Sequence, residues 1–564
     1  MDIRFEQFDA IVVGSGITGG WSAKELTERG LKVLMIERGR MIEHQTDYTN
    51  EMKAPWDMPF QGFGDANLYK REYFLQSQKT MFFNEYTQDH WVNDKENPYQ
   101  QAEGTRFDWF RGYQLGGKSL IWGRQCYRWS DIDFGANKAD GHGVDWPIRY
   151  ADLSPWYDHV EDFIGVSGST EGLEVLPDGH FLPAMEMRAA EKVVKEAMEA
   201  KFPDRRMIMG RSSNITKQVG DRGPCQKRLL CGRGCSYGAY FSTQSSTLPA
   251  ARNTNLLTLL TDTIVESIEY DPASGRATGV RTLNTKTRVR ETYSGKLIMM
   301  NAGTINTNAI LLRSRSERFP NGLANSSGVL GRYLMDHASS TAAVGLVHGI
   351  DNRSYFGNRP NNIIIPRFRN VGDDQQSFHR GYMFQGAASR RGWKRGGDMA
   401  GLGTELKKEL KGPGEWSLFL GAFAECMPNA DNRITLHPEI KDPYGLEQVE
   451  ISFRYGENEK AALRDAEAEA RKMLEAAGCT VVMSSAEPDP GGSSIHEMGG
   501  ARMGNDPSKS VVNAWNQAHD VPNLLVTDGA CMSSTACQNP SLTYMALTAR
   551  ACDAAVSRMK EHAL

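Results

Sequence analysis

The sequence predicts an α/β fold, α+β overall, in which an N-terminal βαβ unit is combined with a second domain built on an antiparallel sheet. Three observations lead to this prediction. Apolar runs at 9–13 and 32–37 flank a helical pattern at 18–29, which indicates a strand, a helix and a strand. Alternating segments between 336 and 455 indicate antiparallel strands. A strand, loop and helix pattern returns at 523–559, so we expect the chain to re-enter its first domain.

The remaining elements follow in order along the chain. The irregular stretch at 42–105 is longer than most loops, which is typical of a functional excursion. A meander of strands is expected at 255–285, with a turn at 271–275. A short strand at 296–301 and a helix at 304–314 follow it. Before the C-terminal return, an amphipathic helix is expected to cover the second sheet, with Leu463, Ala466, Ala470 and Leu474 on one face of residues 457–477.

Length and composition exclude several classes of protein. A chain of 564 residues exceeds the ~250–300 at which single domains usually stop, so we expect two or more domains. The net charge of −4, without a basic stripe, argues against a nucleic-acid binder. No apolar run approaches the ~18 residues of a membrane span. The polar start, Met1 to Phe8, does not resemble a secretory signal, so we expect a cytoplasmic protein.

A glycine motif lies between the first predicted strand and helix. Residues 14–19 match G-x-G-x-x-G. In this pattern Gly14 makes a tight turn, Gly16 lets the backbone approach a pyrophosphate, and Gly19 lets the helix pack closely on the strand. Glu37, at the end of the second strand, can accept hydrogen bonds from a ribose and disfavours NADP. The pattern predicts a Rossmann-like dinucleotide site but does not separate FAD from NAD.

Two C-terminal segments bring together groups suited to proton transfer. Residues 494–504 contain His496, and residues 527–543 contain Asn539 just before a predicted helix. Histidine is the side chain best matched to proton transfer near neutral pH, and a carboxamide can hold a hydroxyl without competing for its proton. His519, the other nearby histidine, is expected in a surface turn. Each residue alone could be structural, but the pair favours catalysis.

These motifs together resemble the glucose–methanol–choline (GMC) oxidoreductases over nearly the whole chain. The resemblance rests on the glycine motif with Glu37, the stretch 116–119 (GGKS), the HxxGG-x-RMG segment at 496–504 and the DGA…NP segment at 528–540. It is closest to the branch of pyranose oxidases, fructose and gluconate dehydrogenase large subunits and glycoside 3-dehydrogenases. It implies a p-hydroxybenzoate hydroxylase-like architecture and FAD. The attachment should be noncovalent, because Ile121 stands where pyranose oxidases often carry the flavin-linked histidine.

The resemblance also implies site residues and a division of the chain. The FAD-binding domain would comprise 1–170, 241–335 and 491–564, with a cysteine-containing excursion at 171–240 and the substrate domain at 336–490. His496 would be the catalytic base and Asn539 would position the substrate oxygen. The implied cofactor-binding residues lie in seven short segments: Gly14, Ser15, Gly16, Thr18, Gly19, Glu37, Arg38, Gly116, Gly117, Ser119, Val265, Ala302, Gly303, Asp528, Gly529, Asn539 and Pro540.

The implied reaction is oxidation of a secondary hydroxyl of a sugar or glycoside, with C3 as the expected position and an acceptor other than oxygen. An O₂-using oxidase, a nicotinamide-dependent dehydrogenase and a non-catalytic flavoprotein subunit stay open as alternatives. By likeness to the large subunits, a small subunit and a cytochrome c are candidate partners, and export with such a partner would place the chain in the periplasm.

Three cysteines lie close together, at Cys225, Cys231 and Cys235. Thiolates at this spacing could ligate iron–sulfur or zinc. The fructose dehydrogenase type of large subunit carries a three-iron cluster in a similar segment, where two of the ligands are adjacent cysteines. Here the second of that pair is Gln226. Plain packed thiols are therefore the favoured interpretation, and a cluster is the alternative.

Overall fold

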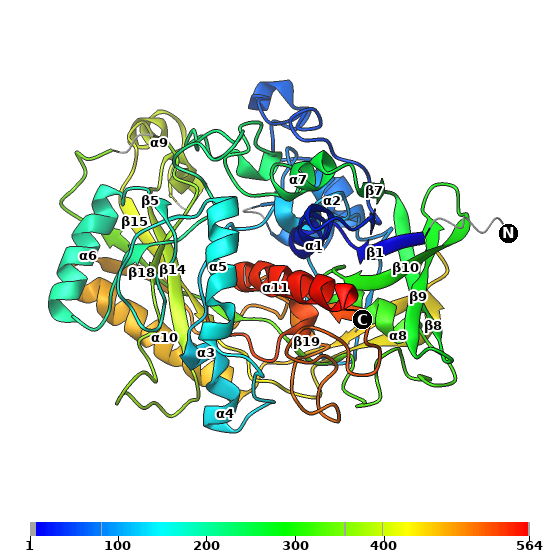
Figure 1. The fold of residues 1–564 in the computed structure, drawn as a ribbon. Coiled ribbons are helices and arrows are strands. Elements are labelled where there is room, and N and C mark those ends of the chain that lie inside the picture. The colour runs from blue at the N-terminus through cyan, green and yellow to red at the C-terminus, as the bar shows by residue number, and fades with distance from the viewer. Residues whose placement is uncertain (1–6, 80–81, 355–356, 398, 562–564) are drawn as a thin grey trace.

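The computed structural model describes residues 7–79, 82–354, 357–397 and 399–561. The chain forms a mixed α/β fold with three larger sheets. In Figure 1 the sheet with the first strand lies at the right, and a large antiparallel sheet lies at the left.

The right-hand sheet is built on the βαβ unit that the sequence predicts. Its parallel strands have the order β7-β2-β1-β10, and β20 also pairs with β10. An antiparallel extension of β9 and β8 continues from β10, which confirms the later part of the meander predicted at 255–285. The first strand of that stretch, β7, does not belong to the meander, because it pairs in parallel with β2 at the opposite edge of the sheet. The strand bounds are β1 (Gln7–Val13), β2 (Val33–Ile36), β7 (Leu257–Leu260), β8 (Thr263–Asp271), β9 (Arg276–Asn284), β10 (Arg290–Met300) and β20 (Leu524–Val526).

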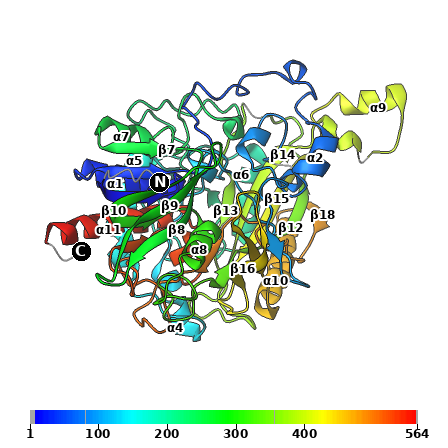
Figure 2. The ribbon, with the colours of Figure 1, turned by 90° about the vertical axis from the view of Figure 1, so that its right-hand side faces the viewer.

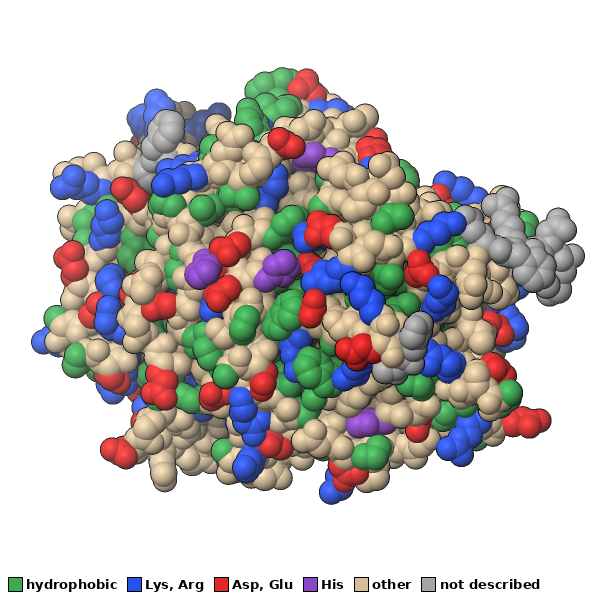
Figure 3. Space-filling model, in the orientation of Figure 1, with side chains coloured by type: hydrophobic (Ala, Val, Ile, Leu, Met, Phe, Trp, Pro, Cys, Tyr) green, Lys and Arg blue, Asp and Glu red, His purple; other side chains and the backbone are tan. Residues whose placement is uncertain are grey.

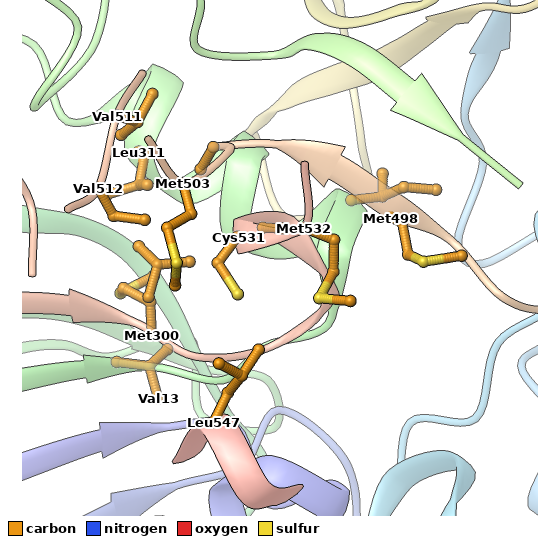
Figure 4. Packing of buried hydrophobic residues seen from close by; sticks show 14 of the residues in the cluster. Val13, Met300, Leu311, Met498, Met503, Val511, Val512, Cys531, Met532 and Leu547 are labelled. Atoms are coloured by element: carbon orange, nitrogen blue, oxygen red, sulfur yellow. The ribbon is translucent and has the colours of Figure 1, made fainter. Parts of the chain in front are cut away.

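Helices cover both faces of this sheet. On one face lie α1 (Ile17–Glu28), α5 (Tyr150–Ile164), α7 (Thr247–Asn253) and α11 (Ser541–Lys560), with α11 packed against α1 and α5. On the other face lie α8 (Thr304–Arg313) and the C-terminal loops. Figure 4 shows part of the core, in which Val13 and Met300 of the sheet and Leu547 of α11 lie in one cluster with Met503 and Cys531 of the C-terminal loops. Burial of both faces explains the continuous apolar runs of the parallel strands.

The left-hand sheet is antiparallel, as the alternating segments predict. Its order is β18-β12-β15-β14-β13-β6. The predicted amphipathic helix is confirmed as α10 (Glu457–Ala476), which packs its apolar face on this sheet beside α6 (Ala189–Lys201). The strand bounds are β6 (Ile208–Met209), β12 (Ala338–Val347), β13 (Ile363–Ile365), β14 (Tyr382–Arg390), β15 (Trp416–Ala424) and β18 (Thr480–Ser484).

A third sheet, of order β19-β11-β16-β17-β3, completes the three. The alternating segment at 447–455 forms β17 here, rather than in the large antiparallel sheet. Its strands are β3 (Gln100–Gln101), β11 (Arg332–Met335), β16 (Arg433–Lys441), β17 (Glu447–Ser452) and β19 (Met498–Gly500). The smaller elements are α2 (Ala66–Glu72), α3 (Asp131–Phe134), α4 (Ala136–Asp140), α9 (Gly403–Leu410), β4 (Ser167–Gly168) and β5 (Leu182–Pro183).

The visible surface mixes charges of both signs. Figure 3 shows acidic and basic side chains interspersed over one face, as the small net charge suggests. The helix α9 stands away from the body of the molecule in the turned view of Figure 2. Among the helices that the described residues form, none has the length and apolar character to cross a membrane.

Candidate active site

A cavity of about 1070 Å³ extends from the turn between β1 and α1 to the large antiparallel sheet. Gly14 and Glu37 line it at one end, and Gln385 and Phe423 of that sheet line it at the other. Most of the predicted cofactor and catalytic residues also line it: Ser15, Gly16, Thr18, Arg38, Gly117, Ser119, Val265, Ala302, Gly303, His496, Asp528, Gly529, Asn539 and Pro540. Gly19 and Gly116 are not among the lining residues.

The glycine motif forms an open cradle at the start of α1. Gly14 has φ +96, and a Cβ there would lie 2.4 Å from the carbonyl oxygen of Asn301. A Cβ on Gly19 would lie 2.0 Å from the carbonyl oxygen of Gly14, so these two glycines are required by close packing. A Cβ on Gly16 would meet no atom within 4 Å. Gly16 is also the N-cap of α1, without a side-chain cap, so the helix N-terminus is open to an anionic group from the cavity.

Glu37 holds the glycine cradle against the segment around Gly116. Its carboxylate accepts hydrogen bonds from Ser15 Oγ at 2.5 Å and from the Gly39 amide at 2.8 Å. Ser15 Oγ in turn accepts from the Gly116 amide at 2.8 Å. Burial raises the pKa of Glu37. A side chain does not fit at Gly116, because a Cβ there would lie 2.2 Å from Gln244 Nε2.

Asp528 organises the opposite wall near the start of α8. Its carboxylate accepts from the Gly303 amide at 2.9 Å and from Thr307 Oγ1 at 2.5 Å, and it also caps Ala530. Burial raises the pKa of Asp528 to about 6. The predicted residues Gly303 and Asp528 are therefore joined directly, although the sequence separates them by more than two hundred residues.

His496 and Asn539 lie side by side in the cavity. Asn539 Nδ2 is 3.0 Å from His496 Nε2, and Asn539 Oδ1 accepts from Gln385 Nε2 at 2.6 Å. Burial, followed by the neighbouring His337 and then by the charges of Lys118 and Lys79, lowers the pKa of His496 well below its usual value of 6.5. The imidazole is therefore neutral at physiological pH and can accept a proton. Among the described residues that line the cavity, His496 is the only histidine.

The loop that carries His496 is fixed by two residues that sequence reasoning missed. Asp336 accepts from the amides of Ser494 at 3.2 Å and His496 at 3.0 Å. His337 contacts His496 directly, with 2.8 Å between their Nδ1 atoms. Between the bonded amides, Ile495 has a φ of 61, in the left-handed region that β-branched residues avoid. These contacts hold the strained loop and present His496 to the cavity.

Sequence reasoning also missed two side chains near His496 and Asn539. Lys118 forms an ion pair at 2.6 Å with Glu497, the residue that follows His496 in the chain. Gln385 comes from β14 of the antiparallel sheet. Lys118 stood inside the GGKS stretch and could have been singled out, whereas nothing local distinguishes Gln385.

Comparison with known proteins decides the family. Residues 8–339 match one family model described as GMC oxidoreductase, and residues 428–548 match a second with the same description. The chain belongs to the GMC oxidoreductase family. It is therefore an oxidoreductase of the class that acts on CH–OH groups.

Relatives of this GMC oxidoreductase span its whole length. It is 28% identical to a 2-methyl-1,2-propanediol dehydrogenase of Mycolicibacterium austroafricanum, over 98% of this chain and 96% of the relative. It is 25% identical to the fructose dehydrogenase large subunit of Gluconobacter japonicus, over 98% of both chains. A pyridoxine 4-oxidase from Mesorbium loti has a similar fold, with a TM-score of 0.62, 16% identity and coverage of 98% and 99% of the two chains.

Family membership implies FAD, and the cavity of this GMC oxidoreductase fits that group. The open space at Gly16 and the uncapped N-terminus of α1 suit a pyrophosphate. The Glu37 carboxylate accepts from three protein donors, Ser15 Oγ and the amides of Ser15 and Gly39, and keeps a lone pair for a ribose hydroxyl. The predicted covalent anchor position holds Ile121, which lines the cavity and has no group able to bond a flavin.

The three clustered cysteines do not form a metal site in the described residues. Cys225, Cys231 and Cys235 are half-buried free thiols, and burial raises the pKa of Cys225 and Cys235. Throughout the described ranges, no group of three or more histidine, cysteine, aspartate or glutamate side chains is placed to hold a metal ion. The geometry of the described residues therefore does not support the iron–sulfur alternative.

Proposed function

We propose that this GMC oxidoreductase oxidises a secondary hydroxyl of a sugar or glycoside, at C3 by expectation, and delivers the electrons to an acceptor other than oxygen. The observation that carries the proposal is the contact between His496 and Asn539, 3.0 Å apart on the cavity wall. This pair lies between the nucleotide cradle and the polar face of the antiparallel sheet.

Each member of the pair has a distinct part in the reaction. A hydroxyl that takes up a position between His496 and Asn539 can donate its proton to the neutral imidazole at Nε2 and accept a hydrogen bond from the Asn539 amide. Loss of the proton to a base is needed because an alcohol has a pKa far above neutrality. Bound FAD would accept the hydride from the carbon. The residues that would hold it are the cradle at Gly16, Glu37 and the wall at Asp528.

The far wall of the cavity suits a polyhydroxylated substrate. Gln385, Asn362, Gln125 and Ser340 line it, and they offer hydrogen-bond donors and acceptors. Phe423 lines it as well, with its ring centroid 6.1 Å from that of His496. Amide groups match sugar hydroxyls, and an aromatic face matches the C–H surface of a sugar ring.

The names of two relatives support this substrate class. The fructose dehydrogenase large subunit is named for a sugar, and a 27% identical paromamine 6'-oxidase of Streptomyces fradiae is named for an aminoglycoside. The first of these relatives is named a dehydrogenase, which supports an electron acceptor other than oxygen. It is also named a large subunit, which supports a partner protein that receives the electrons.

The test is anaerobic reduction of the purified flavoprotein with a panel of aldoses, ketoses and methyl glycosides, with 2-methyl-1,2-propanediol as a small-diol control. We expect carbohydrates to bleach the flavin absorbance and NMR to identify a keto sugar, oxidised at C3. Reduction by the small diol but by no carbohydrate would contradict the substrate class. Mixing the reduced protein with dissolved oxygen tests the acceptor, because rapid reoxidation would identify an oxidase instead.

A further inference from the structure

His337 connects two loops of the active site through its ring. The side chain is fully buried and is not among the cavity-lining residues. Its Nδ1 lies 2.8 Å from His496 Nδ1. Its Nε2 lies 2.9 Å from the carbonyl oxygen of Ala536 and 3.3 Å from that of Thr535, in the loop that leads to Asn539.

The register of two strands explains this contact. Met335 of β11 is the partner of Met498 of β19 in an antiparallel pair. Continuing that register by two residues places His337 opposite His496. The loop bearing His496 therefore meets His337 as a direct consequence of strand pairing, and Tyr455 fixes the same turn by donating from its hydroxyl to the His337 carbonyl at 2.8 Å.

The carbonyl groups determine which nitrogens carry protons. A backbone carbonyl only accepts, so His337 Nε2 must be the N–H that donates to Ala536 and Thr535. Burial lowers the pKa of His337 to about 4, so the ring is neutral and its Nδ1 is an acceptor. His496 Nδ1 must then carry the hydrogen of the 2.8 Å contact. Since His496 is neutral as well, its Nε2 carries no hydrogen and is the hydrogen-bond acceptor on the cavity side of the ring.

The hydrogen bonds of Asn539 and Gln385, on the cavity side of His496, agree with this assignment. A bare His496 Nε2 requires Asn539 to present its Nδ2, which lies 3.0 Å away. Asn539 Oδ1 then accepts from Gln385 Nε2 at 2.6 Å, and Gln385 Oε1 accepts from Asn362 Nδ2 at 2.9 Å. In the series of hydrogen bonds from Asn362 through Gln385, Asn539, His496 and His337 to the carbonyl groups at 535–536, each side chain thus donates to the next group and accepts from the one before.

We propose that His337 is a positioning residue that fixes the tautomer of His496, so that Nε2 is the atom able to take a proton from a substrate hydroxyl. This inference rests on the proposed function of His496 as the base. Without the acceptor at His337 Nδ1, His496 can place its single hydrogen on either nitrogen. The tautomer with hydrogen on Nε2 cannot act as a base toward the cavity.

The direct test is solid-state NMR of the holoprotein with ¹⁵N-labelled histidine, because ¹⁵N shifts separate protonated from bare ring nitrogens without any substrate. The signals are assigned by their loss in His496→Ala and His337→Ala proteins. We expect hydrogen on Nδ1 of His496 and on Nε2 of His337. Hydrogen on Nε2 of His496 in the wild-type protein would overturn the proposal. In His337→Asn, whose side-chain oxygen can replace the Nδ1 acceptor, the His496 pattern should persist.

A double-mutant cycle separates positioning from a purely structural role. With a substrate that bleaches the wild-type flavin, His337→Ala should slow reduction by at least ~10-fold, part of the ~10²–10⁴-fold that a positioned base supplies, with substrate affinity unchanged. His337→Asn should recover most of that loss. In a His496→Ala background the same His337 change should cost little more. A full additional loss there would show that His337 acts on the structure alone, whereas a wild-type rate for His496→Ala by itself would refute the base and not the tautomer.

Discussion

Replacing His496 by alanine is expected to remove base catalysis and leave the cofactor in place. The side chain contacts His337 and Asn539 and makes no hydrogen bond with the glycine cradle or the Asp528 wall. A positioned base contributes ~10²–10⁴-fold, which corresponds to ~3–5 kcal/mol of activation free energy at ~1.4 kcal/mol per tenfold. Loss of a single neutral hydrogen bond, as in Asn539→Ala, costs ~0.5–1.5 kcal/mol, or roughly tenfold at most. His496→Ala should therefore slow flavin reduction much more than Asn539→Ala does.

The assay is stopped-flow reduction of the flavin under anaerobic conditions, with flavin content measured on the same samples. His519→Ala is the matched control, because His519 Nε2 bonds Ser510 Oγ at 3.0 Å and the residue does not line the cavity. We expect a loss of at least ~100-fold for His496→Ala, a smaller loss for Asn539→Ala and a wild-type rate for the control. A wild-type rate in His496→Ala would refute the assigned chemistry, as would a larger loss in His519→Ala.

Four further predictions follow from the cofactor site and from the charges near the base. Glu37→Ala should weaken FAD retention by ~1.5–3 kcal/mol, since the carboxylate that organises the cradle is lost, and unchanged flavin content after dialysis would oppose this. Gly16→Ala should leave the thermal stability of the apoprotein unchanged, because its Cβ meets no atom within 4 Å, but should lower FAD affinity at least tenfold, which titration with FAD measures. Acid precipitation should release all flavin into the supernatant, given Ile121 at the anchor position, and a yellow pellet would contradict this. Lys118→Met should raise the pKa of His496, which that cation helps to lower, so the loss of activity on acidification should begin at a higher pH than in the wild type; an unmoved pH profile of flavin reduction would show that Lys118 has no such effect.

Local signals made the cofactor end of the site predictable. The βαβ unit is visible as buried strands flanking a helix, and Gly14, Gly16 and Glu37 have spacings that depend only on that unit. His496 and Asn539 could be predicted because each lies in a motif that resembles the family. The structure brings both to one cavity, with contact between their side chains.

Contacts that depend on strand register could not be predicted. His337 and His496 are 159 residues apart, and their meeting requires β11 to pair with β19 in one particular register. Gln385 and Asn539 are 154 residues apart, and β14 first has to take its place in the antiparallel sheet. The cysteine spacing illustrates the opposite case, because proximity in sequence suggested ligands that the fold does not gather into a metal site.

The position of β20 and α11 has a consequence for biosynthesis. The strands β1 and β10 are translated well before β20, the other neighbour of β10, which begins at Leu524. The helix α11, which covers α1, is translated later still. During translation, one apolar face of α1 therefore stays uncovered until α11 has been made. A chain that stops before Leu524 would therefore keep the glycine cradle but lack Asn539, the strand β20 beside β10 and the helix that covers α1.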